Sequence, residues 1–315
     1  MQETYINKSS NDFDDEIDLR ELFYVLLKAK WIIASVTVFI STIGVIYSLL
    51  LPNIYESKAL LVPVESSSSI SRTLGGYNNL AGLAGISLPS SGEDGNFIKA
   101  TQKISSLSFF ENSILTNIYL PDLMAFKSWN SKTNTVAYDE NIYDTNTNTW
   151  IRDYSYPQKQ MPSAQESFAV FKSTHLTFSE DKKTGFSTLS IKHQSPFIAK
   201  QWTELIVDEI NSFYRQKDKS ESEKAVSYLN QQISMTGLSE IKQVLAQLLQ
   251  EEIKKLTLIE AKKFYVFDYI DPPVVMELKA EPKRALICIF SSLLGGLLSI
   301  VLVLIRHYAF NKKTS

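Results

Sequence analysis

The sequence predicts an α+β fold in which two transmembrane helices flank a domain with a small mixed sheet and long extended helices. Two uncharged runs, residues 31–51 and 285–305, are each 21 residues long. A bilayer core needs about 20 apolar residues in a helix, so each run is long enough to span. Between the runs, short alternating segments typical of strands stand beside much longer segments with helical periodicity. These three observations define the predicted fold class.

The first uncharged run is expected to be a retained membrane anchor. It begins too far from the start of the chain, and is too long, for a typical cleaved signal peptide. A buried helix of a soluble protein is the alternative, but such a helix usually keeps a polar face, and neither run has one. Neither run contains an ionisable residue, which argues against an ion or proton pathway.

Basic residues predict the orientation of both runs. Arg20, Lys28 and Lys30 precede the first run, whereas only Lys58 follows it within twenty residues. The positive-inside rule therefore places the N-terminus in the cytoplasm, and a second span returns the C-terminus to the same side. Three cations just before the second run weaken this signal. The predicted parts are a cytoplasmic tail 1–30, spans 31–51 and 285–305, an outer domain 52–284 and a cytoplasmic tail 306–315.

Small residues recur every three or four positions in both runs. Such spacing makes a flat stripe on a membrane helix, which lets a second helix approach closely. The expected partner is the other span of the same or a neighbouring protomer. The predicted packing residues are Ser41, Gly44 and Ser48 in the first run, and Ser291, Gly295, Gly296 and Ser299 in the second.

Strands are predicted at both ends of the outer domain and in its middle. Residues 53–63 and 262–270 read as strands, and we expect them to be neighbours in one sheet. Residues 175–193 alternate on both sides of a polar turn, which indicates a β-hairpin with Gly185 available for positive φ. Residues 121–162 are polar throughout and are interpreted as irregular surface.

Long helices are predicted over residues 196–262. Ser195 is a natural N-cap and Pro196 a natural first position for a helix that continues to residue 235. Such a helix is about 60 Å long at 1.5 Å per residue, which is too long for a compact domain. The charged run 215–224 within it is interpreted as a solvated face. Residues 97–119 also have helical spacing.

Composition offers little for catalysis. The net charge of −2 gives no general attraction for nucleic acid. The three histidines, His175, His193 and His307, are far apart in the sequence, so we expect no metal site. The single cysteine, Cys288, cannot form a disulfide within the chain. We find no phosphate-binding loop and expect no cofactor. Trp202 and the tyrosine-rich segment 138–156 are candidate glycan contacts, although an aromatic residue at helical spacing is more often part of a core.

Four segments carry a resemblance to a known family. They are "DDEIDLRELFYVLLKAKWII" (14–33), "YESKALLVP" (Tyr55–Pro63), "SPFIAKQWTELIVDEIN" (195–211) and "AEPKRALICIFSSLLGGLLS" (280–299). In this order the chain resembles the polysaccharide co-polymerases, which are the chain-length determinants of O-antigen and related surface polysaccharides (the Wzz family). Pro282 and Lys283 stand where the family has a proline-rich membrane-proximal motif, but members often have more prolines there.

The resemblance implies a regulator of polysaccharide chain length and not an enzyme. It implies a homo-oligomeric ring in the inner membrane of a Gram-negative bacterium, with a periplasmic domain. The implied partners are a polysaccharide polymerase and, as a further possibility, its lipid-linked glycan. The short segment after the second span resembles the kinase-free class. The alternatives are a two-span extracytoplasmic sensor, for which a cytoplasmic output is expected, and a glycan-modifying membrane protein, for which paired carboxylates are expected.

Overall fold

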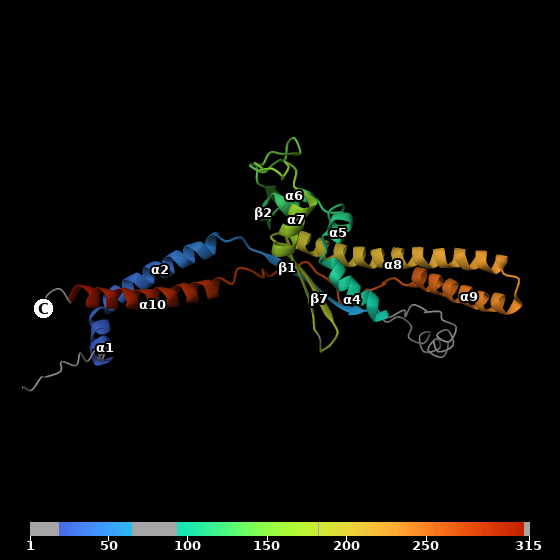
Figure 1. Cartoon of the computed structure of the whole chain (residues 1–315). Helices are drawn as coiled ribbons and strands as arrows, with labels where there is room; N and C mark the ends of the chain where they lie inside the picture. The colour runs from blue at the N-terminus through green and yellow to red at the C-terminus, as the bar shows by residue number, and fades with distance from the viewer. Residues whose placement is uncertain (1–18, 65–92, 182, 312–315) are drawn as a thin grey trace, which may run out of the picture. The chain divides into compact units, whose positions relative to one another are not determined.

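The computed structural model describes residues 19–64, 93–181 and 183–311 (Figure 1). The chain divides into two compact units, of which the first combines Met1–Pro52 with Glu281–Ser315 and the second is Asn53–Ala280. The fold class is α+β with an apolar helix near each end of the chain, as predicted. The predicted tails lie partly outside the described residues, namely at residues 1–18 and 312–315.

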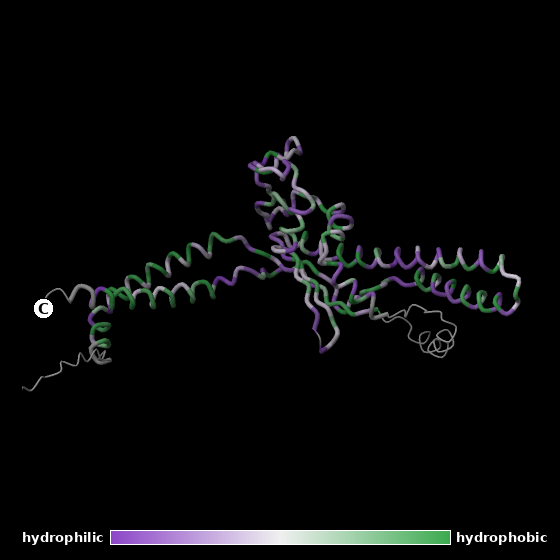
Figure 2. The backbone as a smooth tube through the Cα atoms, in the orientation of Figure 1, coloured by the Kyte–Doolittle hydropathy of each residue, from purple (hydrophilic) through white to green (hydrophobic). Residues whose placement is uncertain are grey.

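The described part of the first unit consists of three helices. Two of them, α2 and α10, pack side by side along their length and are dominated by hydrophobic residues (Figure 2). Their most apolar windows have a mean hydropathy of 2.1 and 2.6, so both are long and apolar enough to cross a membrane. The third, α1, is helical although it lies within the predicted cytoplasmic tail 1–30. The helices are α1 (Leu19–Lys28), α2 (Lys30–Leu50) and α10 (Arg284–Asn311).

The second unit is built on a four-stranded sheet with the order β6-β7-β1-β8. All three pairings are antiparallel, so the expectation of a mixed sheet is wrong. The reason is topological: β6 and β7 form a hairpin, while β1 opens the unit and β8 closes it in the opposite direction. The predicted pairing of the first and last strands is confirmed. The strands are β1 (Tyr55–Pro63), β6 (Leu176–Glu180), β7 (Ser187–His193) and β8 (Phe267–Asp271).

A single long helix, α8 (Pro196–Met235), follows the β6-β7 hairpin, as predicted. Its 40 residues span about 60 Å at 1.5 Å per residue. Its first half buries Trp202, Ile206 and Ile210 in the core that also contains β1 and β7. Its second half lies beside the returning helix α9 (Ser239–Ala261) (Figure 1).

Short helices and π-helical turns cover the rest of the core. Residues 97–119, whose spacing is helical, are interrupted where the Ser106 hydroxyl accepts a hydrogen bond from the Phe109 N–H at 3.3 Å and starts a new helical turn. The elements are α4 (Glu93–Ile104), α5 (Leu107–Phe109), the π-helical turn η1 (Phe110–Ile114), α6 (Leu120–Met124), α7 (Ala164–Val170) and the π-helical turn η2 (Phe171–His175).

Residues 121–162 contain two small hairpins, so their interpretation as irregular surface is wrong in part. Both turns contain an asparagine at positive φ, Asn134 at 52° and Asn148 at 53°. Asparagine tolerates this region better than most residues, because its short side chain can hydrogen-bond locally. The hairpins pair β2 (Phe126–Asn130) with β3 (Thr135–Tyr138), and β4 (Tyr143–Asp144) with β5 (Thr149–Trp150).

Candidate functional site

The face between α2 and α10 brings together most of the predicted packing residues. On α10 the buried positions Gly295, Ser299 and Val303 follow Ser291 at intervals of four, which places them on one side of the helix. On α2 the side chain of Ser48 is buried. The large hydrophobic side chains of α2 and α10 are thus mostly exposed, whereas the small residues named above face the neighbouring helix.

The two helices come closest where a glycine removes a side chain. A Cβ built on Gly44 would overlap the side chain of Ser291. A Cβ built on Gly295 would lie 3.1 Å from Cβ of Ile40 and 3.3 Å from Cα of Thr37. Glycine at these positions therefore permits the close approach of the two backbones, as small residues do in membrane helix pairs.

Polar contacts between the helices occur along the pair and at one of its ends. Along the pair, the hydroxyls of Thr37 and Ser299 are 3.5 Å apart. At the end, Nε of Arg284 donates to the carbonyl of Ser48 at 3.2 Å, where α2 has its last unsatisfied carbonyls. Because residue numbers rise in opposite directions along these contacts, α2 and α10 are antiparallel.

Two predicted packing residues are placed differently from the others. A Cβ built on Gly296 would point into open space, since it meets no atom of the described residues beyond the adjoining backbone of its own helix. The half-buried Ser41 donates its hydroxyl hydrogen to the Thr37 carbonyl of its own helix at 2.8 Å. In the membrane-proximal motif, the carbonyls of Pro282 and Lys283 accept the first backbone hydrogen bonds of α10, at 2.9 Å each.

The second unit contains a buried histidine pair that the sequence did not predict. The rings of His175 and His193 are stacked with their centroids 5.5 Å apart, and both pack on Trp202. Nδ1 of His175 donates to the Lys192 carbonyl at 2.6 Å, while Nδ1 of His193 accepts the Ser195 N–H at 3.0 Å. The Ser195 hydroxyl makes no capping bond to α8, although the residue stands at the N-cap position.

The environment of the pair favours the neutral form of both rings. Burial, together with the neighbouring His175, lowers the pKa of His193 to about 4. Burial also lowers the pKa of His175. Nε2 of His193 lies 3.2 Å from the Asp122 carbonyl, to which it donates. Since backbone groups already engage these nitrogens, the pair has a structural role. No group of three metal-ligating residues occurs within residues 19–64, 93–181 and 183–311.

Asn211 on α8 is a buried polar hub that sequence reasoning missed. Its Oδ1 accepts hydrogen bonds from the backbone N–H groups of Tyr265, Val266 and Phe267 at 3.2, 2.7 and 3.0 Å. Its Nδ2 donates to the Phe267 carbonyl at 3.0 Å. These bonds hold residues 265–267 against α8, and β8 begins only at Phe267, which corrects the expected strand 262–270. Only the tertiary structure reveals the pairing, since the partners lie over fifty residues apart.

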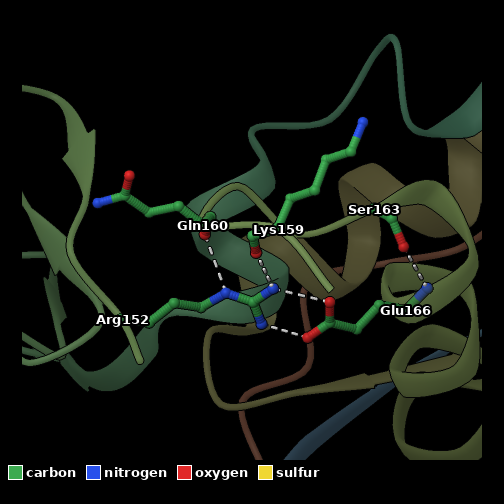
Figure 3. Close-up of polar contacts among 5 residues, drawn as sticks. All are labelled: Arg152, Lys159, Gln160, Ser163 and Glu166. Atoms are coloured by element: carbon green, nitrogen blue, oxygen red, sulfur yellow. Dashed lines mark hydrogen bonds and ion pairs between the residues drawn. The ribbon is translucent and has the colours of Figure 1, made fainter. Parts of the chain in front are cut away.

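Arg152 clamps the loop between β5 and α7 (Figure 3). Its guanidinium forms a two-pronged ion pair with Glu166, in which Nη2 lies 2.8 Å from Oε2. Nε and Nη2 also donate to the carbonyls of Gln160 and Lys159 at 2.9 and 2.8 Å. The hydrogen bond from Arg152 lowers the pKa of the Glu166 carboxyl, and the same bond raises the pKa of Arg152.

The candidate glycan contacts divide into buried and exposed residues. Trp202 is only 2% exposed, so it is part of the core and unavailable to a ligand. In the segment 138–156, Tyr143 is buried and shares a hydroxyl hydrogen bond of 2.7 Å with Tyr119, whereas Tyr156 is exposed. That bond, together with burial, raises the pKa of Tyr119 to about 12.

The charged run 215–224 is more than a solvated face. Nη2 of Arg215 donates to the carbonyls of Lys262 and Lys263 at 2.8 and 2.6 Å, where α9 ends. Oδ2 of Asp218 accepts from the Tyr265 hydroxyl at 2.6 Å. These charge-assisted bonds attach the middle of α8 to the segment that leads into β8.

Comparison with known proteins identifies the family region. Residues 15–112 match the family model described as Wzz, chain length determinant protein. The matched region contains α2 and β1, so the resemblance predicted from residues 14–33 and Tyr55–Pro63 is confirmed. This part of the chain is therefore similar to the corresponding part of Wzz chain length determinant proteins. The resemblance at 195–211 and 280–299 lies outside the match and stays a prediction.

Solved structures of polysaccharide co-polymerases are among those similar to this chain. A full-length bacterial polysaccharide co-polymerase is 16% identical, with 95% of this chain and 100% of that chain covered at a TM-score of 0.41. A fragment of WzzB, a polysaccharide co-polymerase from Salmonella Typhimurium, is 11% identical, with 73% of this chain and 100% of that chain covered at a TM-score of 0.31. No curated protein sequence matches the chain.

Proposed function

We propose that this chain regulates the length of a surface polysaccharide, O-antigen lipopolysaccharide or a related glycan. It does so as an oligomeric scaffold of the inner membrane of a Gram-negative bacterium, together with the polysaccharide polymerase. The observation that carries this proposal is the match of residues 15–112 to the chain length determinant family. The two candidate membrane helices support it, since they supply the means of anchoring.

The proposed topology has both termini in the cytoplasm and residues 52–284 in the periplasm. Basic residues before the first span support this orientation. In this arrangement the scaffold needs no catalytic residue of its own, because the polymerase performs the chemistry. The spans pack through Gly44, Ser291 and Gly295, and the open surface at Gly296 is available to a helix of another protomer or of the polymerase.

Surface polysaccharide from a deletion strain, separated by gel electrophoresis beside the parent, tests this function. We expect a cluster of preferred lengths in the parent and an unregulated ladder in the deletion strain. Expression of this chain from a plasmid should restore the cluster. A deletion strain with the parental distribution, in a genome without a second determinant, would contradict the proposal and leave the sensor and glycan-modifying alternatives to be tested.

A further inference from the structure

A groove runs along one side of the helix pair in the first unit. It encloses about 560 Å³ between α2 and α10. Its walls are apolar side chains, among them Ile43 of α2 and Phe290, Leu294 and Leu298 of α10. These side chains are exposed in the chain by itself, so the groove is open to whatever surrounds the helix pair.

One end of the groove is charged. Lys283 and Tyr47 both line it, and they lie at the same end because the neighbouring residues Arg284 and Ser48 are hydrogen-bonded. In the lining, Lys283 is the only ionisable group apart from the Tyr47 phenol. Cationic and aromatic side chains are typical of the level where a membrane helix meets the lipid headgroups.

The groove is long enough to cover one leaflet. Lys283 and Leu298 are fifteen positions apart in the sequence, which corresponds to about 22 Å along a helix at 1.5 Å per residue. Half of a hydrocarbon core of about 30 Å is about 15 Å. A lipid whose headgroup lies beside Lys283 can therefore keep its whole hydrocarbon chain within the groove.

We propose that this groove binds one anionic phospholipid, with an acyl chain along the apolar walls and its phosphate against the Lys283 ammonium. The inference rests on the proposed function in one respect, namely that α2 and α10 lie in a bilayer. A second copy of this chain is a poorer occupant, because its spans contain no anionic side chain. An equivalent copy would bring Lys283 and Arg284, two cations against the single anion Glu281, to the same depth, where the net like charge repels.

Lipid binding to the full-length chain, purified in a non-ionic detergent, provides the test. Native mass spectrometry would compare phosphatidylglycerol with phosphatidylcholine as probes. We expect one phosphatidylglycerol per chain to be retained in preference to phosphatidylcholine. Lys283→Gln should reduce the preference about five-fold, since one cation near a headgroup contributes about 1 kcal/mol. Lys30→Gln, at the opposite end of the pair, should leave it unchanged.

A second pair of variants tests the apolar walls. Leu294→Trp fills the groove and should weaken the retention of both lipids. Leu297→Trp is the matched control, because Leu297 is 58% exposed, similar to the 56% of Leu294, but lies outside the groove. Equal retention by these two variants would overturn the inference. A Leu294→Trp variant that loses a dimer of the chain but retains its lipid would also overturn it, because the groove would then hold a second copy. So would displacement of phosphatidylglycerol by a polyprenyl phosphate at equal concentration, because the groove would then prefer a different lipid.

Extraction of the membranes with alkaline carbonate distinguishes a wrong lipid site from a wrong topology. If alkaline carbonate removes the chain from membranes, α2 and α10 do not span, and the proposed topology falls together with the lipid site. If the chain stays in the membrane and controls polysaccharide length but shows no lipid preference, only the lipid site is wrong.

Discussion

The side chain of Ser291 occupies the place that a Cβ of residue 44 would need. Gly44 is therefore the position at which the approach of α2 and α10 is most sensitive to side-chain size. Gly295, one turn of α10 further on, meets Ile40 and Thr37 in a similar but less tight contact. The close packing of the pair thus depends on two glycines, Gly44 on α2, which faces α10, and Gly295 on α10, which faces α2.

Gly44→Ala should separate the two helices. The added methyl group cannot be accommodated without a shift of Ser291, and overpacking of this kind costs about 1–3 kcal/mol. We expect a lower midpoint of thermal unfolding for the detergent-solubilised chain. Gly296→Ala is the matched control, since a Cβ there would meet no atom of the described residues beyond the adjoining backbone of its own helix. Equal midpoints for the two variants would show that the close contact does not stabilise the pair.

Asn211→Leu should destabilise the second unit strongly. The substitution keeps the volume but leaves the N–H groups of Tyr265, Val266 and Phe267 without their acceptor, and each buried unsatisfied group costs about 1–3 kcal/mol. We expect a loss of about 3 kcal/mol or more in the free energy of unfolding by urea. The exposed Asn117, changed to Leu in the same way, should alter this free energy by less than about 0.5 kcal/mol.

Much of the framework was predictable from local sequence. Helix α8 follows from Ser195-Pro196 and a sustained apolar stripe, and the β6-β7 hairpin follows from alternation around Gly185, whose φ is +73°. Each of these elements is predictable because the residues that specify it are close to one another in the sequence. The small-residue spacing singled out Gly44 and Gly295, and a Cβ at either position would meet an atom of the neighbouring helix, while the role of the other predicted packing residues stays a prediction.

Features that depend on distant partners were not predictable. Asn211 reads as an ordinary polar residue of a helix until residues 265–267 come into contact with it. His175 and His193 are far apart in the sequence, but β6 and β7 bring them together. The hairpin at β2 and β3 was missed because its turn uses Asn134 and its alternating runs are very short.

The free energy of unfolding of the second unit should fall as the pH decreases through the acid range. The pKa of His193 is about 4 in the folded protein and 6.5 in its ordinary state, so the unfolded chain binds more protons between these values. Stability from this group is fully present above about pH 6.5 and is lost as the pH falls toward 4. The full loss is roughly 3 kcal/mol at 1.36 kcal/mol per pKa unit.

Fluorescence of Trp202, which packs on both rings, can follow this unfolding. A His193→Gln variant should lose part of the pH dependence between 4 and 6.5, since His175, whose pKa burial also lowers, still contributes, whereas His307→Gln, on α10, should retain it in full. If the wild type and His193→Gln lose stability in parallel, the buried imidazole is not the group that titrates.

Arg152→Ala should release the loop that precedes α7. It removes hydrogen bonds to Glu166 and to the carbonyls of Lys159 and Gln160, and hydrogen bonds to charged groups are each worth about 1.5–3 kcal/mol. We expect chymotrypsin to cleave after the exposed Tyr154 about ten-fold faster or more, because local opening becomes easier. Lys159→Ala removes only a side chain that the clamp does not use and should be cleaved at the wild-type rate.

The distribution of polysaccharide lengths in a complemented deletion strain tests the central claim most directly. Plasmids would carry the wild-type chain or Gly295→Leu, at equal amounts in the membrane fraction. We predict that the wild type restores a cluster of preferred lengths and that Gly295→Leu gives shorter or randomised lengths, because the larger side chain forces α2 and α10 apart. A wild-type chain that leaves the ladder unregulated would contradict the assignment as a chain length determinant, and a normal distribution with Gly295→Leu would contradict the role of helix packing.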